Sequence, residues 1–288
     1  MQDNPKRRIR ANSKRGRRSS RKAVPEVIQS LSIIYPMYNE RDNIPIAVSE
    51  ALRVGHMIVP ELEIIVVDDA STDGSGAIAD RLAEQHQEVR VIHHDRNRKL
   101  GGSLKTGFAA ASKEWVLYMD SDLPIRMDDA LDAVPLADDA DVVIGWRRSR
   151  AESWKRELMS KVYNRLIRLL FKLRVKDVNF AFKLFRRDLL DRIVLKSEGS
   201  FIDAELLLEM RRVGARIAEI GMDYYPRVAG VSTLASSRVV LVILREMLRY
   251  RLEAHGKTSD NLDSERGRLR PERVDQPRDP VGASERDR

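Results

Sequence analysis

The segment WVLYMDSDLP, residues 115–124, ends an apolar run with two aspartates that stand one residue apart, Asp120 and Asp122. The run WVLYM has the length and composition of a buried β-strand. Two carboxylates at this spacing repel each other, so we expect a cation or hydrogen-bond donors to hold them together. Mg²⁺ and Mn²⁺ prefer carboxylate, phosphate and water oxygens as ligands. The segment therefore predicts a strand end that holds a metal-bound diphosphate.

Residues 31–145 alternate short apolar runs with stretches of helical periodicity. We expect strands at 31–35, 62–67, 89–94, 115–119 and 140–145, and helices at 44–58, 74–86 and 102–112. This alternation predicts an α/β fold in which helices flank a mostly parallel central sheet. Ligands of such sheets bind at the carboxyl ends of the strands, so the residues at those ends are the candidates for function.

Polar residues cluster at two more of the expected strand ends, in PMYNERDN (36–43) and DDASTDGS (68–75). A single aspartate at a strand end is usually a helix cap, and Ser71 or Asp73 could cap the helix that follows Gly74. Capping does not account for three acidic clusters at one edge, because buried carboxylates need a cation or hydrogen-bond donors. The three clusters together predict a ligand site.

The net charge of +8 is unevenly distributed along the 288 residues. Residues 1–22 contain ten Lys or Arg and one acid, which predicts a disordered basic arm. The polar tail 257–288 is also predicted to be disordered. The chain contains no cysteine, which excludes disulfides and thiolate chemistry. No segment reaches the roughly 20 apolar residues that span a bilayer, and no secretory signal is evident, so we expect a cytoplasmic protein.

The motifs, taken in order, resemble family-2 glycosyltransferases, which are nucleotide-sugar enzymes of the GT-A fold. The matching segments are YNE (38–40), DDASTDGS (68–75), LGGSLKTG (100–107) and DSD (120–122). Later segments resemble the polyprenyl-phosphate hexose synthase branch, namely DVVIGWRR (141–148), VKDVNFAFKLFRRDLL (175–190) and YPRVAGVS (225–232). We therefore expect four parts: a basic arm at 1–29, a GT-A domain at 30–235, an amphipathic helix at 236–256 and a tail at 257–288.

The resemblance implies a role for each motif residue. Asp120 and Asp122 would flank the metal, Mg²⁺ or Mn²⁺, with Asp122 as a direct ligand. Arg147 and Arg148 would meet phosphate oxygens of the donor or the acceptor, which suit the guanidinium fork. The implied nucleotide-sugar-binding residues are Pro36, Tyr38, Glu40, Asp68, Asp69, Lys105, Asp120, Arg148, Arg227 and Ser232. The last two would lie on a segment that closes over the diphosphate.

The chain also departs from the pattern of that branch. A Gln that often follows the acidic pair, and can add a metal contact, is replaced by Pro124, whose side chain cannot ligate. Water would then fill that place in the metal shell. The lysine of the Gly-rich loop is displaced to Lys105. Asp177 and Asn179 fall where the family has acceptor-side residues.

The implied reaction is an inverting displacement at the sugar C1 of a GDP- or UDP-sugar, with a polyprenyl phosphate as acceptor. A hydroxyl acceptor would need a general base, whereas a polyprenyl phosphate is already anionic. The implied catalytic residues are Asp122, Asp203 and Arg147. Asp203, in FIDAELLLEMRR (201–212), fits a base and a first-turn helix acid equally well. The acceptor therefore stays open between a phosphate and a hydroxyl.

Two stretches, 154–176 and 238–255, interleave Lys and Arg with apolar residues at helical spacing. Such helices can lie in the lipid interface, although a single one is more often a core helix with a solvated basic face. Two of them plus a basic arm favour a peripheral enzyme at the cytoplasmic face of a membrane.

Two alternatives compete with this interpretation. One is a soluble glycosyltransferase that acts on a saccharide or small-molecule hydroxyl. The other is a nucleic-acid-binding protein that acts through its arm, which the acidic strand ends disfavour. His93 and His94 end a strand without metal-ligand spacing, so we expect them at the surface or in a supporting role. The nucleobase, the sugar and the oligomeric state stay open.

Overall fold

The computed structural model describes residues 28–148, 154–224, 243 and 245–252. Several predictions from the sequence lie outside these residues. They are the basic arm up to residue 27, the closing segment with Arg227 and Ser232, most of the amphipathic stretch before residue 243, and the tail.

The core of the fold is one seven-stranded sheet in the order β3-β2-β1-β4-β6-β5-β7. Its strands are β1 (Ser30–Met37), β2 (Glu61–Asp68), β3 (Val89–His93), β4 (Trp115–Met119), β5 (Val142–Arg147), β6 (Phe182–Arg186) and β7 (Ile217–Met222). All neighbouring pairs are parallel except those of β6, which is antiparallel to both β4 and β5. The predicted mostly parallel α/β sheet is thus confirmed. The sequence pattern did not predict β6 and β7.

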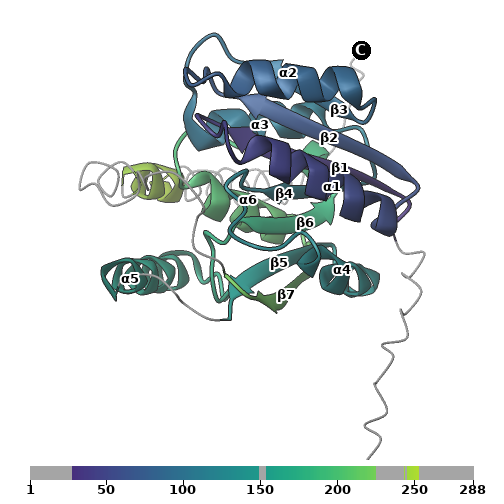
Figure 1. The fold of residues 1–288 in the computed structure, drawn as a ribbon. Helices are drawn as coiled ribbons and strands as arrows, with labels where there is room; N and C mark the ends of the chain where they lie inside the picture. The colour runs from purple at the N-terminus through teal and green to yellow at the C-terminus, as the bar shows by residue number, and fades with distance from the viewer. Residues whose placement is uncertain (1–27, 149–153, 225–242, 244, 253–288) are drawn as a thin grey trace, which may run out of the picture.

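Helices cover both faces of this sheet (Figure 1). They are α1 (Ile44–Ile58), α2 (Ser75–Gln85), α3 (Lys99–Ala110), α4 (Asp129–Ala133), α5 (Trp154–Phe171) and α6 (Ile202–Arg212), with short 3₁₀ helices η1 (Val134–Asp138) and η2 (Arg187–Arg192). Successive side chains of β1 point to opposite faces of the sheet and pack into two different layers of the core. Ile33 and Tyr35 pack with α1 and α4, whereas Ile34 faces the opposite layer with α3, α5 and α6.

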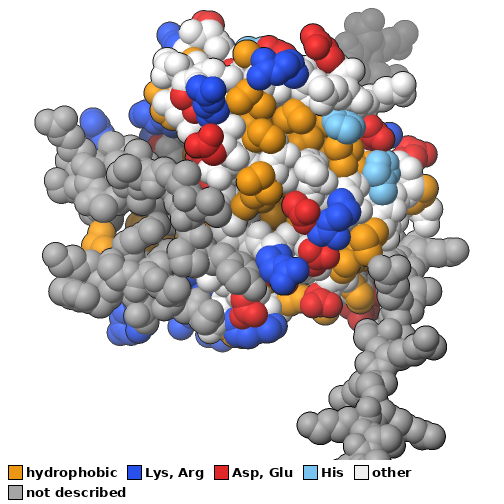
Figure 2. Space-filling model, in the orientation of Figure 1, with side chains coloured by type: hydrophobic (Ala, Val, Ile, Leu, Met, Phe, Trp, Pro, Cys, Tyr) orange, Lys and Arg blue, Asp and Glu red, His pale blue; other side chains and the backbone are white. Residues whose placement is uncertain are grey.

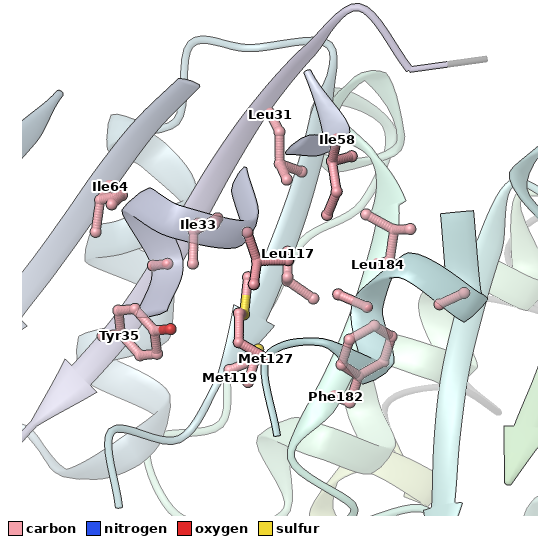
Figure 3. Close-up of a cluster of buried hydrophobic side chains, with 14 of the residues drawn as sticks. Leu31, Ile33, Tyr35, Ile58, Ile64, Leu117, Met119, Met127, Phe182 and Leu184 are labelled. Atoms are coloured by element: carbon pink, nitrogen blue, oxygen red, sulfur yellow. The ribbon is translucent and has the colours of Figure 1, made fainter. Parts of the chain in front are cut away.

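The layer under α1 is a continuous apolar cluster (Figure 3). Strand residues Leu31, Ile33, Leu117 and Leu184 are 0–2% exposed there, and Ile58 closes the cluster from the end of α1. Burial of each such side chain contributes about 1.5–3 kcal/mol relative to exposure. The outer face of this layer carries mixed acidic, basic and apolar side chains (Figure 2).

Buried acids of α6 hold the segment that precedes this helix. Glu205, 1% exposed, accepts hydrogen bonds from the backbone N–H groups of Lys196 and Ser197, at 2.9 and 2.8 Å. The same segment abuts α3, where the N–H of Gly101 donates to the carbonyl of Glu198 at 2.8 Å. A Cβ on Gly101 would lie 2.3 Å from the carbonyl oxygen of Ser197, so only glycine fits this contact.

Replacing Gly101 with alanine therefore tests the contact between α3 and the segment at 196–199. Alanine gains about 1 kcal/mol of helix propensity, but the clash is with backbone, which cannot rotate away as a side chain could. We expect Gly101→Ala to lower the free energy of unfolding by roughly 1–2 kcal/mol, measured by urea denaturation. The exposed substitution Ala109→Ser on the same helix is the control. A Gly101→Ala variant as stable as the wild type would contradict the packing described.

Candidate active site

The polar segments that follow β1, β2 and β4 are joined by hydrogen bonds. The N–H of Asn39 donates to Ser71 Oγ at 3.0 Å, and the N–H of Thr72 donates to Asn39 Oδ1 at 2.8 Å. Ser121 Oγ donates to the carbonyl of Pro36 at 3.0 Å, which links the end of β4 to the end of β1. The three acidic segments therefore converge at one edge of the sheet, as the sequence predicted.

Asp68, the last residue of β2, is fixed by its own loop and by β3. Its Oδ1 accepts the N–H of Ser71 at 3.0 Å, and its Oδ2 lies 2.9 Å from His93 Nδ1. The other ring nitrogen of His93 lies 2.8 Å from Asp80 Oδ1. Hydrogen bonds to Asp80 and Asp68 raise the pKa of His93 above its ordinary value.

Asp69 lies in a buried polar chain that orders the loop after β3. Its Oδ1 lies 2.7 Å from His94 Nδ1 and accepts the N–H of Arg98 at 2.7 Å. His94 Nε2 in turn lies 2.9 Å from Thr106 Oγ1 on α3. The side chains of His94 and Asp69 are 3% and 4% exposed. His94 therefore has a supporting role, as expected, whereas the sequence did not indicate that Asp69 anchors the loop after β3.

The acidic pair after β4 is crowded. Asp122 is 4% exposed, and Asp120 Oδ1 accepts a hydrogen bond from the hydroxyl of Tyr118 at 3.1 Å. Burial, then the charges of Asp122 and Asp203, raise the pKa of Asp120 to about 7, while Lys183 and the Tyr118 hydroxyl act in the opposite direction. This end of β4 therefore has a surplus of negative charge.

Lys183 provides a buried positive charge beside this pair. It lies on β6 directly opposite Tyr118 and is 1% exposed. Its Nζ donates to Asp203 Oδ1 at 2.5 Å and to the carbonyl of Phe180 at 2.9 Å. The N-cap of α6 is Phe201, so Asp203 lies in the first turn and pairs with Lys183 instead of capping the helix. In the sequence, the signal for this pair is a lysine among the apolar residues of FKLFR (182–186), which was not among the predicted site residues.

The second group of predicted residues lies at the carboxyl end of β5, at the same edge of the sheet. β5 and β4 are both antiparallel to β6, so their carboxyl ends point the same way. Arg147 Nε lies 3.5 Å from Asp177 Oδ2, and the guanidinium lies 4.8 Å from the ring centroid of Tyr224. Asn179 Oδ1 is buried and accepts no hydrogen bond from the described residues. Because β6 separates β4 from β5, the strands that precede the acidic pair and carry Arg147 lie two strand spacings, about 10 Å, apart.

The remaining predicted residues are placed around this edge. Tyr38 is 48% exposed, and Glu40 accepts a hydrogen bond from Asn43 at 2.6 Å. Lys105 Nζ, on α3, donates to the carbonyl of Lys196 at 3.4 Å. Arg148 donates to the carbonyl of Gly221 at 2.6 Å, which binds it to β7. Arg227 and Ser232 lie outside the described residues.

The donor set at the end of β4 suits a hard divalent cation, because it consists of carboxylate oxygens with surplus negative charge. Within the residues that the structure describes, no three His, Asp or Glu side chains form a complete metal site. Mg²⁺ would take its other ligands from water and phosphate, as is usual for this ion. The residues that would hold it are Asp122 and Asp120.

Comparison with known proteins places these features in a family. Residues 32–194 match the model of the glycosyl transferase family 2. The chain is 31% identical over 226 residues to the polyprenol monophosphomannose synthase of Mycolicibacterium smegmatis, covering 73% of this chain and 83% of the relative. It is 30% identical over 220 residues to the undecaprenyl-phosphate mannosyltransferase of Micrococcus luteus, covering 72% of this chain and 88% of the relative.

A solved structure supports the fold assignment. The mannosyltransferase from Pyrobaculum calidifontis in complex with GDP-Man and Mn²⁺ superposes with a TM-score of 0.57 at 21% identity. The match covers 79% of this chain and 66% of that one. The predicted GT-A-like fold is thereby confirmed.

The raised pKa of His93 has a consequence for stability. Because the folded-state pKa exceeds the unfolded value of about 6.5, the stabilisation is complete below that pH and is lost as the pH rises through the folded pKa. We expect His93→Gln to cost roughly 0.5–1 kcal/mol more at pH 6 than at pH 9, after allowance for solvent screening of this partly exposed ring. Urea unfolding at both pH values measures the difference, with His86→Gln as control. An equal cost at both values would refute the ion-pair assignment.

Proposed function

Because this chain belongs to glycosyltransferase family 2, we propose that it is a metal-dependent inverting hexosyltransferase. The donor would be a GDP- or UDP-sugar and the acceptor a polyprenyl phosphate. The observation that carries this proposal is the convergence of an acidic pair and an arginine at one edge of the sheet. The acidic pair suits the metal and diphosphate of a donor, and the arginine suits the phosphate of an acceptor.

The donor side of the proposed site is built from the ends of β1, β2 and β4. Asp68 and Glu40 would accept hydrogen bonds from the base and ribose, with Pro36, Tyr38 and Asp69 lining the same pocket. Asp120 and Asp122 would hold Mg²⁺ or Mn²⁺, which when bound stabilises negative charge on the diphosphate. Lys105 on α3 would lie near the sugar or the phosphates, with Arg227 and Ser232 on a segment that closes over them.

The acceptor side is centred on Arg147. Its Nε lies 3.5 Å from Asp177 Oδ2 and its guanidinium lies over the ring of Tyr224, so two neighbouring side chains orient it toward this edge of the sheet. In the proposed reaction an acceptor phosphate oxygen forms a bond to the sugar C1 as the bond from C1 to the diphosphate oxygen breaks. The electron pair leaves with the nucleoside diphosphate. Arg147 and Arg148 would position the acceptor phosphate for this attack.

The names of the relatives support this choice of acceptor over a hydroxyl. The two relatives described above are named as a polyprenol monophosphomannose synthase and an undecaprenyl-phosphate mannosyltransferase. A soluble transferase that acts on a hydroxyl is the second candidate, and it would use Asp203 as its base. A nucleic-acid-binding function through the basic arm is a distant third, because it gives the acidic strand ends no role.

A basic and apolar surface supports a peripheral membrane site, which we propose as part of the same function. On α5, Met159, Val162 and Leu169 are 47–65% exposed in one stripe, and residues 159–172 include basic but no acidic side chains. Residues 245–252 are helical and expose Leu248 and Leu252.

The two helices of this surface are in contact. Arg251 donates to the carbonyl of Leu170 at 3.3 Å, and the rings of Phe171 and Tyr250 lie 5.6 Å apart. Figure 1 places both helices at the left of the molecule, and basic side chains line the lower left of Figure 2. Basic amphipathic helices of this kind bind anionic lipid interfaces. No helix among the described residues has the length and apolar character of a membrane span.

A transfer assay tests the proposed reaction. The purified chain is incubated with Mn²⁺ or Mg²⁺ and GDP-mannose, UDP-glucose or UDP-N-acetylglucosamine, with and without a short polyprenyl phosphate. We expect transfer of one sugar to the lipid, its loss on chelation of the metal, and a loss of at least about 100-fold in Asp122→Ala.

The exposed Asp132→Ala variant is the control for that assay and is expected to keep wild-type activity. Turnover of a donor without transfer of sugar to the lipid would favour the alternative in which the acceptor is a hydroxyl. Failure to turn over or bind any of the three donors would refute the proposed transferase activity.

Sedimentation with lipid vesicles tests the membrane surface. We expect the chain to bind phosphatidylglycerol-containing vesicles, with affinity that falls as salt rises. The double variant Leu169→Asp/Leu248→Asp should bind about tenfold more weakly, because it places carboxylates in the apolar stripe. Met57→Asp, at an exposed apolar position on α1, is the matched control. Equal vesicle binding by both variants would show that these two helices do not form the lipid-binding surface.

A further inference from the structure

The turn that enters β6 lies between the end of β4 and the end of β5. Because β6 is antiparallel to both of these strands, its first residues lie at the edge where β4 and β5 end (Figure 1). Phe182, the first residue of β6, pairs with Met119, the last residue of β4. Residues 177–181, which lead into β6, therefore lie at the same edge of the sheet as the acidic pair and Arg147.

The backbone of this turn is held by two neighbouring elements. The N–H of Lys176 donates to Glu219 Oε1 on β7 at 2.7 Å, and the N–H of Val178 donates to Asn164 Oδ1 on α5 at 3.0 Å. The side chain of Val178 is also buried in the core, with 1% of its surface exposed. The turn is thus fixed on both sides of Asp177 by groups outside it.

Asn179, in the same turn, has a side-chain amide that the described part of the chain does not use. Its Oδ1 atom is buried, and the amide forms no hydrogen bond with the described residues. Asp177 is 2% exposed, and neither of its carboxylate oxygens accepts a hydrogen bond within those residues, although Oδ2 lies 3.5 Å from Arg147 Nε. Buried polar atoms are nearly always hydrogen-bonded in proteins, so unpaired acceptors at this edge indicate a ligand.

The chemistry of these atoms indicates the kind of ligand. An amide oxygen and a carboxylate accept hydrogen bonds, so they need a ligand that donates them. A phosphate group offers acceptor oxygens and negative charge, which the carboxylate of Asp177 would repel. Hydroxyl groups both donate and accept hydrogen bonds, as a carboxamide also does. The turn therefore suits the hydroxyl groups of a sugar better than a phosphate.

The position of the turn agrees with this chemistry. In the proposed reaction, the sugar lies between the diphosphate at the end of β4 and the acceptor phosphate near Arg147 on β5. β6 is the strand between these two, so a side chain at its start is placed to reach the transferred hexose.

We propose that Asn179 binds a hydroxyl group of the transferred hexose and thereby helps to select the sugar. This inference rests on the proposed function, and it assigns Asn179 to the donor sugar instead of the acceptor side that the family resemblance implies. Asp177 stays the partner of Arg147. A site that hydrogen-bonds one hydroxyl group discriminates against an epimer that carries this group in another orientation.

Calorimetric titration of the full chain with Mn²⁺ tests whether Asn179 contacts the sugar. Each nucleotide sugar is compared with the nucleoside diphosphate that lacks the hexose, GDP-mannose with GDP and UDP-glucose with UDP. We expect Asn179→Leu to bind the nucleotide sugar about three- to tenfold more weakly, because one hydrogen bond is lost. Binding of the nucleoside diphosphate should stay at the wild-type value. An equal loss for both ligands would overturn the sugar assignment.

Transfer kinetics separate the donor sugar from the acceptor. We expect Asn179→Leu to lower kcat/KM for the donor by about tenfold and to leave the KM for a polyprenyl phosphate unchanged. The preference between epimeric donors should also fall, measured with GDP-mannose against GDP-glucose and with UDP-glucose against UDP-galactose. Gln87→Leu, at an exposed carboxamide just before β3 and so at the opposite edge of the sheet, is the control. A raised KM for the polyprenyl phosphate with unchanged donor kinetics would return Asn179 to the acceptor side.

Thermal unfolding distinguishes a ligand role from a structural role. Because the amide of Asn179 forms no hydrogen bond with the described residues, Asn179→Leu should unfold within about 2 °C of the wild-type midpoint or above it. A midpoint lower by about 5 °C or more would show that the amide stabilises the turn, and would overturn the ligand role.

These outcomes are distinguishable from failure of the proposed function. A wild type that binds none of the nucleotide sugars would refute the transferase proposal and the sugar site with it. A wild type that binds and transfers sugar, with an Asn179→Leu variant that does both equally well, would refute the sugar site alone.

Discussion

Crowding of negative charge at the carboxyl end of β4 is the constraint on which the site depends. Asp120, Asp122 and Asp203 act on one another there, and one buried ammonium group, that of Lys183, offsets only part of their charge. Such crowding opposes folding, because buried carboxylates lose their hydration. Proteins tolerate conflicts of this kind mainly at functional sites. A divalent cation and a diphosphate would resolve the conflict, which gives the proposed nucleotide-sugar site a physical basis.

The scaffold meets this constraint by fixing the segments around the acids. Strand order places the ends of β2, β1 and β4 side by side, and hydrogen bonds between their loops keep them together. His93, the last residue of β3, binds Asp68, and His94, which follows it, binds Asp69, so the two aspartates at the end of β2 are held from the end of the neighbouring strand. On the other side, β6 separates the acidic pair from Arg147 and carries Lys183 between them. The acidic pair and Arg147 thus lie at one edge of the sheet, with one strand between the strands that carry them.

Local pattern predicted the strands up to β5 and the helical stretches that contain α5 and α6, but it predicted neither β6 nor β7. The helix expected at 44–58 is α1 with the same bounds, and the convergence of three acidic segments followed from parallel strands. β6 was missed because FKLFR is short, and its antiparallel pairing with β4 is a long-range contact that no periodicity encodes. The sequence could not distinguish a base from a helix acid at Asp203, because its partner, Lys183, lies 20 residues earlier in the sequence.

The location of the bound cation is the most direct test of the proposed metal site. Crystals of the full chain grown with Mn²⁺ and GDP or UDP would show the ion by its anomalous scattering. We expect a single strong peak in contact with Asp122 and the bound diphosphate, at the carboxyl end of β4. A diphosphate bound away from this edge, or bound here with no metal at Asp122, would contradict it.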